Sequence, residues 1–293
     1  MRKTAKIMAA NDRNRHSIDA LLPPEMAEQA EHIGAAKARL DTLSLLVLAV
    51  LAGAFIALGA LFSTTTVAGA AGVWPFGVVR LLGGLVFSLG LILVVVGGAE
   101  LFTGNNLMVM AWAGRLIPLG ALLRAWALVY VGNFVGAVGT AVLVFLSGQY
   151  GFGGGAVGKT ALSIATAKAA LPFGEALVLG ILCNVLVCLA IWLSYSARTV
   201  VGKVVAVVPP ITAFVAAGFE HSIANMYFLP IGLMIKAWAP RAFWQSVVAA
   251  PGDFAGLTVA ASVANLVPVT IGNIIGGGLL VGTVYWFVYL RKR

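Results

Sequence analysis

Two short polar stretches interrupt apolar segments of this chain and carry the residues that could do chemistry. Gly98–Asn106 and Gly218–Met226 each contain a glycine, a glutamate and an asparagine, and each residue lies 120 positions from its counterpart. Carboxylates and amides are costly at membrane depth, and ionisable residues found there are usually functional. We therefore interpret both stretches as functional breaks. The paired residues are Gly98 and Gly218, Glu100 and Glu220, and Asn105 and Asn225.

A histidine distinguishes the second break from the first. His221 follows Glu220 directly, whereas Leu101 stands at that position in the first half. A buried histidine can be an ordinary hydrogen-bonded core residue, but a position inside a helix break favours a functional role for this one. Because the two glutamates are symmetric, we expect Glu100 and Glu220 to anchor the broken loops by accepting backbone N–H bonds. The chemistry is expected at His221.

The composition is that of an integral membrane protein. The chain has 293 residues, of which 61% are hydrophobic and 10% charged, and its mean hydropathy is +1.01. Soluble domains carry about 25% charged residues. The net charge of +9 is therefore assigned to loops and tails facing a lipid bilayer, and no nucleic-acid partner is expected.

The apolar runs predict six membrane spans, since a spanning helix needs about 20 apolar residues. Residues 1–40 are expected to form a cytoplasmic N-terminal segment, disordered to about residue 20 and then a short amphipathic helix over Pro24–Leu40. Residues 41–293 are expected to form the membrane domain. The predicted spans are Leu43–Phe62, Val78–Trp112 with the first break, Ala125–Leu146, Ala176–Tyr195, Val204–Ile235 with the second break, and Ala260–Leu290. A glycine-rich loop is expected at Gly148–Gly158.

The positive charges predict the orientation of these spans. With both termini inside, the inside segments hold 14 Lys and Arg residues and the outside segments hold 5. Inside loops carry the excess of positive charge, so both termini are expected in the cytoplasm. The first 40 residues also lack the apolar core of a signal peptide.

The repeat extends beyond the two breaks. Gly132-Asn133 and Gly136 in the third span match Gly272-Asn273 and Gly276 in the sixth. Each half has three spans, so the two halves must insert with opposite topology. Inverted repeats with broken helices at corresponding places indicate a substrate path at the repeat interface. Irregular backbone at membrane depth is tolerated only against protein or a water-filled cavity. The sequence therefore predicts a pore or transporter.

Several enzyme and cofactor classes are excluded by counting. Cys183 and Cys188 would point apart on a helix and give too few ligands for a metal site. A haem-binding subunit needs paired axial ligands, and His221 is the one histidine within the spans. No Gly-x-Ser-x-Gly nucleophile stretch occurs in the spans, and an aspartyl protease would need Asp in the apolar core, where there is none. We expect no metal, no cofactor and no enzymatic activity.

Four motifs together resemble the formate/nitrite transporter family of pentameric anion channels. They are GAELFTGNNLMV, LGILCNVLVCLAIWLSYS, AAGFEHSIANMYFLPIG and PVTIGNIIGGGLLVG. The resemblance covers about residues 25 to 290. It implies an all-α membrane fold with six aquaporin-like helices, of which helices 2 and 5 are broken, and a homo-pentamer with one pore per protomer. It also implies a multi-pass protein of a bacterial inner membrane.

The resemblance assigns roles to individual residues. His221 matches the family's central pore histidine, and Thr103 matches the threonine that faces it. Asn184 and Asn273 match asparagines that orient the site, and Lys168 resembles a vestibule lysine that attracts anions. The residues that match the apolar constrictions are Phe87, Leu91, Leu101, Phe102, Val187 and Phe214.

These assignments predict passage of small monovalent anions, and formate is the substrate that we expect. A further prediction is that transport is coupled to protons through His221. Imidazole suits this role because it exchanges a proton near neutral pH. Nitrite and hydrosulfide are the alternatives within the family. A neutral-solute pore is the alternative from another class, but its paired Asn-Pro-Ala motifs are absent from both breaks. A structural subunit without flux would leave the polar breaks without a purpose.

Overall fold

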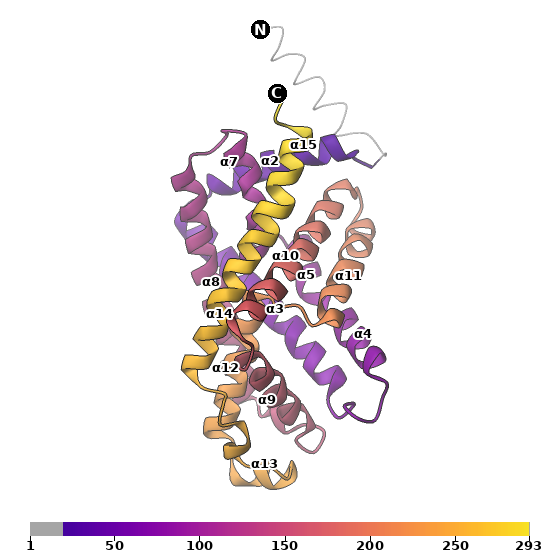
Figure 1. The fold of residues 1–293 in the computed structure, drawn as a ribbon, viewed down its shortest axis with the longest axis vertical. Helices are drawn as coiled ribbons and strands as arrows, with labels where there is room; N and C mark the ends of the chain where they lie inside the picture. The colour runs from indigo at the N-terminus through magenta and orange to yellow at the C-terminus, as the bar shows by residue number, and fades with distance from the viewer. Residues whose placement is uncertain (1–19, 293) are drawn as a thin grey trace.

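A computed structural model of the chain describes residues 20–292 (Figure 1). Helices and turns account for this range, which confirms the all-α prediction, and the expectation for residues 1–19 lies outside it. The first half contains α2 (Pro23–Ala38), α3 (Thr42–Val67), α4 (Phe76–Phe87), α5 (Leu89–Gly97), α6 (Phe102–Asn105), the 3₁₀ turn η1 (Asn106–Met108), α7 (Val109–Ala113) and α8 (Leu119–Leu146). The second half contains the 3₁₀ turn η2 (Gln149–Gly151), α9 (Ala156–Ala169), α10 (Phe173–Ser196), α11 (Val200–Ala217), α12 (Ser222–Trp238), α13 (Arg241–Ser246), the 3₁₀ turn η3 (Pro251–Phe254), α14 (Val259–Ile274), the π-helical segment η4 (Ile275–Thr283) and α15 (Val284–Tyr289).

Six segments of the described chain are long and apolar enough to cross a membrane, as the sequence predicts. They are Thr42–Val67, Phe76–Gly97, Leu119–Leu146, Phe173–Ser196, Val200–Ala217 and Pro251–Tyr289. The largest difference from the predicted helix boundaries is at α8, which begins at Leu119 and not near Ala125. The helix therefore includes Arg124, whose guanidinium donates to the Leu40 carbonyl and to the Thr42 hydroxyl.

Glycine ends the helix at both breaks. Gly98 and Gly218 each have a φ of 80°, the left-handed conformation that terminates helices at low cost for glycine. After each glycine, the backbone N–H of a glutamate leaves its own helix and donates to a neighbouring span. Glu100 donates to the Leu48 carbonyl and Glu220 to the Leu179 carbonyl, both at 3.2 Å. The helical path resumes at α6 and α12.

The two halves correspond to each other beyond the breaks. Lys37 and Lys168 are 131 positions apart, as are Leu48 and Leu179, the two acceptors at the breaks. This spacing makes α9 the counterpart of α2 and α10 the counterpart of α3. Figure 1 shows α2 at one end of the bundle, near α15 and the C-terminus, and α9 towards the opposite end. Equivalent helices thus lie at opposite ends, which is the geometry of an inverted repeat.

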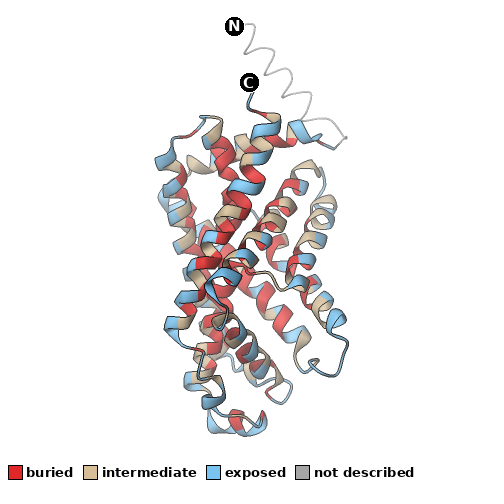
Figure 2. Ribbon diagram, in the orientation of Figure 1, coloured by how far each residue is buried: buried red, intermediate tan, exposed pale blue. Residues whose placement is uncertain are grey.

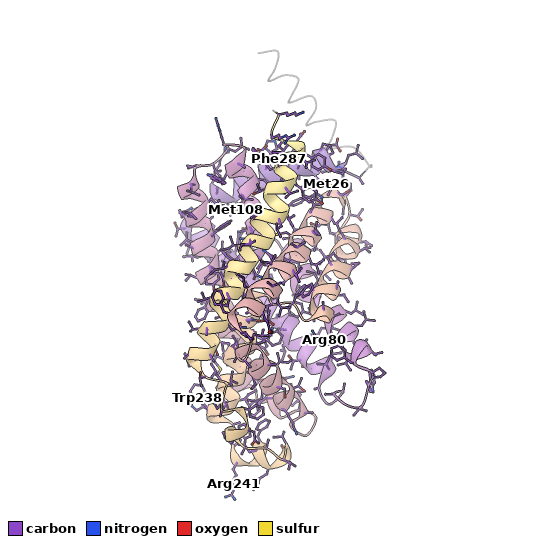
Figure 3. All side chains as sticks on the ribbon, in the orientation of Figure 1. Met26, Arg80, Met108, Trp238, Arg241 and Phe287 are labelled. Carbon is purple, nitrogen blue, oxygen red and sulfur yellow. The ribbon has the colours of Figure 1, made fainter. Side chains whose placement is uncertain are left out.

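The short helices α2 and α9 differ from what the sequence predicts. The helix expected at Pro24–Leu40 is α2, and it packs on the protein itself. Met26, Ala27 and Ala30 of α2 are buried in a cluster with Trp192 and Leu290. Figure 3 labels Met26 at this end of the bundle, together with Met108. The sequence does not predict α9, because the glycine-rich composition of Gly148–Gly158 hides its beginning.

Close helix contacts depend on glycine. A Cβ at Gly136 of α8 would lie 1.9 Å from the Val50 carbonyl oxygen of α3, and one at Gly272 of α14 would lie 2.2 Å from the Leu177 carbonyl oxygen of α10. Small residues let spanning helices approach to backbone contact in this way. Figure 2 shows the buried residues on inward faces of the helices, whereas exposed residues lie on outward faces and at both ends. The tight packing holds the two breaks in a fixed position inside the bundle.

Candidate functional site

The two breaks meet at a hydrogen bond between Thr103 and His221. The Thr103 hydroxyl lies 2.9 Å from His221 Nε2, and the two residues are 0% and 2% exposed. The Phe214 ring stacks on the imidazole at a centroid distance of 5.9 Å. A hydroxyl from one half of the chain and an imidazole from the other therefore form one buried polar contact, between the two residues that the family resemblance implies face each other.

The backbone determines which nitrogen of His221 carries the proton. His221 is the N-cap of α12, and its Nδ1 accepts the Ala224 N–H at 3.1 Å. A nitrogen that accepts a hydrogen bond cannot carry a proton, so the neutral ring has its proton on Nε2. Nε2 is the nitrogen that faces Thr103. The imidazole therefore presents a hydrogen-bond donor towards the contact between the two breaks.

Asn184 of α10 joins the first break to α14. Its Nδ2 lies 2.8 Å from Asn106 Oδ1, 2.7 Å from the Asn273 carbonyl and 3.2 Å from the Thr103 carbonyl. The Cys188 thiol donates to the same Thr103 carbonyl at 3.3 Å. These bonds fix the backbone of Thr103, and hence the direction of its hydroxyl.

Asn273 supports the second break through its backbone. Its Oδ1 accepts the Ser222 N–H at 2.9 Å, and its Nδ2 donates to the Gly180 and Glu220 carbonyls at 2.8 and 3.0 Å. Ser222 and Glu220 flank His221 in the chain. Asn273 therefore holds the backbone on both sides of the histidine.

The two glutamates bind partners that differ from the expected backbone N–H groups. Among the described residues, Glu220 accepts from Asn225 Nδ2 at 2.6 Å and pairs with Lys168 Nζ at 2.7 Å. Glu100 accepts from Asn105 Nδ2 at 2.7 Å and lies 3.0 Å from Lys37 Nζ. The carboxylates thus anchor side chains, whereas amides such as Asn273 anchor the backbone. An asparagine can do so because it carries both a donor and an acceptor.

Two cavities approach the Thr103–His221 contact from opposite ends. The first, which we call the α2 cavity, has a volume of about 730 Å³, and its lining includes residues of α2 together with Lys37, Glu100, Leu101 and Asn105. The second, the α9 cavity, has a volume of about 740 Å³, and its lining includes residues of α9 together with Lys168, Glu220 and His221. Each cavity therefore reaches one break and its lysine–glutamate pair.

The six apolar residues assigned to constrictions divide between these regions. Phe87 and Phe214 line the α9 cavity and contact each other edge to face, with a centroid distance of 5.5 Å. Leu101 lines the α2 cavity. The remaining three side chains line neither cavity and are at most 3% exposed; they are Leu91, Phe102 and Val187. Apolar side chains thus surround the polar contact on both sides.

Comparison with known proteins assigns this architecture to a family. The sequence pattern described as formate/nitrite transporter matches residues 24–287. The chain belongs to the formate/nitrite transporter family. Its relatives include the formate channel FocA of Escherichia coli strain K12, which is 49% identical over 94% of this chain and 96% of the relative. FocA of Haemophilus influenzae is 41% identical over 93% of this chain and 96% of the relative.

Solved structures agree with this membership. A structure described as a pentameric formate channel with formate bound matches with a TM-score of 0.81 and 42% identity, covering 85% of this chain and 98% of the other. A structure described as an FNT family ion channel matches with a TM-score of 0.74 and 29% identity, covering 90% of this chain and 98% of the other. The chain is thus a multi-pass membrane protein of a transporter family, which also confirms the prediction that it is not an enzyme.

Lys37 lies at the site, but the sequence does not predict it there. The sequence places it only among the charges of the N-terminal segment, but its Nζ lies 2.7 Å from Asn105 Oδ1, next to Glu100. Its spacing of 131 positions from Lys168 is the signal that could find it. Asn265 is missed as well; it accepts from Asn225 Nδ2 at 2.8 Å. Asn133 and Asn273 are 140 positions apart, and the residue 140 positions before Asn265 is Ala125. The repeat therefore offers no matching asparagine in the first half that would mark Asn265.

Metal chemistry has no site in the described part of the chain. Residues 20–292 contain no cluster of three or more His, Cys, Asp or Glu side chains placed to hold an ion. Cys183 and Cys188 are free thiols, both buried.

Proposed function

We propose that the chain is a membrane channel for formate, acting as a homo-pentamer in which each protomer has its own pore. The observation that carries this proposal is the buried Thr103–His221 hydrogen bond between two cavities. The path from one cavity to the other leads through the two breaks. The formate channels of related sequence and the similar pentameric structure support the substrate and the assembly.

The barrier to a small anion is the apolar and buried part of this path. A bare charge at the bilayer centre costs about 2.5–3.5 kcal/mol or more. Phe87, Phe214 and Leu101 offer the anion no hydrogen bonds. Nε2–H of His221 and the Thr103 hydroxyl are donors that lie between the cavities, and a bound carboxylate can accept from both once their mutual bond opens.

The hydrogen bond from Ala224 to His221 restricts the proton chemistry. A neutral imidazole with its proton on Nε2 donates a hydrogen bond to formate, but it does not release that proton readily. Transfer to the anion requires an imidazolium, which has a proton on both nitrogens. Protonation of Nδ1 breaks the cap bond to Ala224 N–H and places a cation at a helix N-terminus, which the helix dipole disfavours. We therefore infer that hydrogen-bond donation is the resting role of His221, and that proton transfer needs the cap to open.

The proposed orientation puts both termini, α2 and the C-terminal arginines in the cytoplasm of a bacterium, with the channel in its inner membrane. The excess of Lys and Arg on that side supports it. The α2 cavity then opens inwards and the α9 cavity outwards. A cysteine introduced at Val248, which is 90% exposed beyond α13, should react with a membrane-impermeant maleimide in intact cells. Labelling only after lysis would reverse the orientation.

A flux assay in proteoliposomes tests the proposed function. Formate should cross rapidly, with the purified protein running as a pentamer in detergent. Nitrite is tested in parallel because the family's description includes it, and hydrosulfide is tested as a third anion. Glycerol should not cross, since the pore is proposed to select anions. Passage of glycerol without formate would instead identify a neutral-solute pore.

A further inference from the structure

Positive charge is distributed unequally between the two cavities. The charged side chains that line the α9 cavity are Arg80, Lys159, Lys168 and Glu220, an excess of two positive charges. Those that line the α2 cavity are Lys37, Arg198, Lys203, Glu25, Glu28 and Glu100, which balance. A cleft lined by one sign of charge concentrates counter-ions. The α9 cavity is therefore the end at which anions accumulate.

Lys168 is not the source of this excess. Its ammonium pairs with the Glu220 carboxylate at 2.7 Å, and the two side chains are 15% and 5% exposed. A charge neutralised at this distance contributes little to the field in the rest of the cavity. The two remaining cations, Arg80 and Lys159, donate to backbone carbonyls, which carry no formal charge to neutralise theirs.

Arg80 combines charge with a fixed position. It projects from the first turns of α4, and Figure 3 shows it between the middle of the bundle and the α13 end. Its Nε donates to the Ala216 carbonyl at 3.0 Å, and its Nη2 donates to the Val215 carbonyl. Both acceptors lie in the last turn of α11, just before the break that carries His221. The guanidinium also lies 5.9 Å from the centroid of the Phe76 ring.

The unused edge of this guanidinium is a donor for an anion. Nε and Nη2 are occupied, and within the described chain Nη1 donates to no protein group. Arginine presents its donors as a planar fork that matches carboxylates. Ionisable side chains in membrane segments usually face a water-filled cavity and mark substrate or ion pathways.

We propose that Arg80 is the first binding station for small monovalent oxyanions in the α9 cavity, with Lys159 supplying additional long-range attraction. This assignment rests on the proposed anion channel function. An anion held at Nη1 lies in the cavity that His221 also lines. Arg80 thus raises the local anion concentration before the apolar constriction, and its carbonyl bonds keep the donor in place when the anion leaves.

Formate influx from the α9 side, measured against formate concentration, tests the proposal. At low ionic strength Arg80→Gln should raise the half-saturating concentration about fivefold and change the maximal flux less than about twofold. The increase should shrink at about 0.5 M salt, because screening weakens the attraction. Arg80→Lys, which keeps the charge, should stay within about twofold of the wild type.

Lys236→Gln is the matched control. Lys236 also donates to two carbonyls, those of Ala255 and Leu257, but it does not line the α9 cavity. An unchanged half-saturating concentration in Arg80→Gln, with the pentamer intact, overturns the proposal. An increase that persists at high salt, or one that Arg80→Lys shares, identifies a purely structural clamp and also overturns it.

Binding without transport separates this proposal from the proposed function. Formate at low ionic strength should raise the melting temperature of the wild-type pentamer in detergent, and should do so less in Arg80→Gln. A wild-type protein that transports no formate across the liposome membrane refutes the channel function. The difference between the formate-induced melting shifts of the wild type and of Arg80→Gln then tests anion binding at Arg80 independently of transport. Equal shifts overturn it.

Discussion

Asn133 and Asn273 make the same three hydrogen bonds in the two halves of the chain. Asn133 Oδ1 accepts the Phe102 N–H at 2.9 Å, and its Nδ2 donates to the Ala49 and Glu100 carbonyls at 2.7 and 2.9 Å. Asn273 bonds the corresponding groups at 2.9, 2.8 and 3.0 Å. A break in a membrane helix frees backbone groups that lipid cannot satisfy. One asparagine on the third membrane span of each half, α8 or α14, satisfies these groups.

Removal of Asn133 should therefore destabilise the protein. Asn133→Ala leaves the Phe102 N–H and the Glu100 carbonyl unpaired inside the bundle, which should cost about 2–6 kcal/mol for two buried groups. The melting temperature of the purified protein in detergent measures the loss. Thr140→Ala on the same helix is the control, because among residues 20–292 the Thr140 hydroxyl bonds only to the Gly136 carbonyl of its own helix. Equal melting temperatures for the two variants would contradict this role of Asn133.

The contact between α3 and α8 should not tolerate a methyl group at Gly136. The added Cβ would lie 1.9 Å from the Val50 carbonyl, so the helices must separate, at a cost of about 1–3 kcal/mol. At Gly139, further along α8, an added Cβ would meet no atom of another segment within 4 Å. Gly139→Ala should be neutral, or stabilising by up to about 1 kcal/mol through helix propensity. Thermal melting of the two variants side by side checks the difference, and a stable Gly136→Ala protein would disprove the close contact.

The sequence predicts the scaffold well because membranes restrict the possible folds. Apolar runs give the six spans, and the repeat at 120 positions gives both breaks and the asymmetry between Leu101 and His221. The prediction for the glutamates is wrong in its detail. A sequence shows that Glu100 and Asn105 recur together as Glu220 and Asn225, but it does not show which groups bond.

Lys37 illustrates a second limit. The repeat has three spacings, namely 120 positions for the breaks, 131 for α2 and α3 against α9 and α10, and 140 for Asn133 and Asn273. Insertions in connecting loops change the spacing without changing the packing. A search at one spacing therefore finds the breaks and misses Lys37, because its counterpart Lys168 lies at another. Hydrophobic periodicity likewise places α2 on a surface and cannot reveal that its lysine reaches a membrane-embedded glutamate.

The Lys168–Glu220 pair should act as a unit in stability. Removing one partner leaves a buried charge unpaired, which costs about 3–5 kcal/mol. Lys168→Met alone should therefore lower the melting temperature more than Lys168→Met combined with Glu220→Gln. The Lys37–Glu100 pair has a longer distance of 3.0 Å, and its side chains are 25% and 8% exposed. In a corresponding double-mutant cycle, removal of one partner of this pair should therefore lower the melting temperature less. Additive effects in the first cycle would show that the pair is not coupled.

Replacement of His221 by asparagine should separate its structural role from its proton chemistry. Asparagine is a good N-cap residue, so His221→Asn can still accept a hydrogen bond from the start of α12, whereas its shorter amide does not reach the Nε2 position that faces Thr103. The melting temperature should change little. The variant has no titratable group at this position, so the pH dependence of formate flux that belongs to the protein should disappear. Flux in proteoliposomes between about pH 5 and about pH 8 measures it, after subtraction of the formic acid leak in empty liposomes.

Thr103→Ser is the matched control for this experiment, because it keeps the hydroxyl that faces Nε2 and leaves the imidazole in place. It should retain the pH profile of the wild type. If His221→Asn retains that profile as well, the imidazole takes no part in proton exchange. A fall in melting temperature as large as that of Asn133→Ala would contradict the expectation that asparagine preserves the cap of α12. For His221→Asn we expect a formate flux that does not depend on pH and a melting temperature that is unchanged. This combination is expected for a residue that caps a helix with Nδ1 and meets the anion with Nε2.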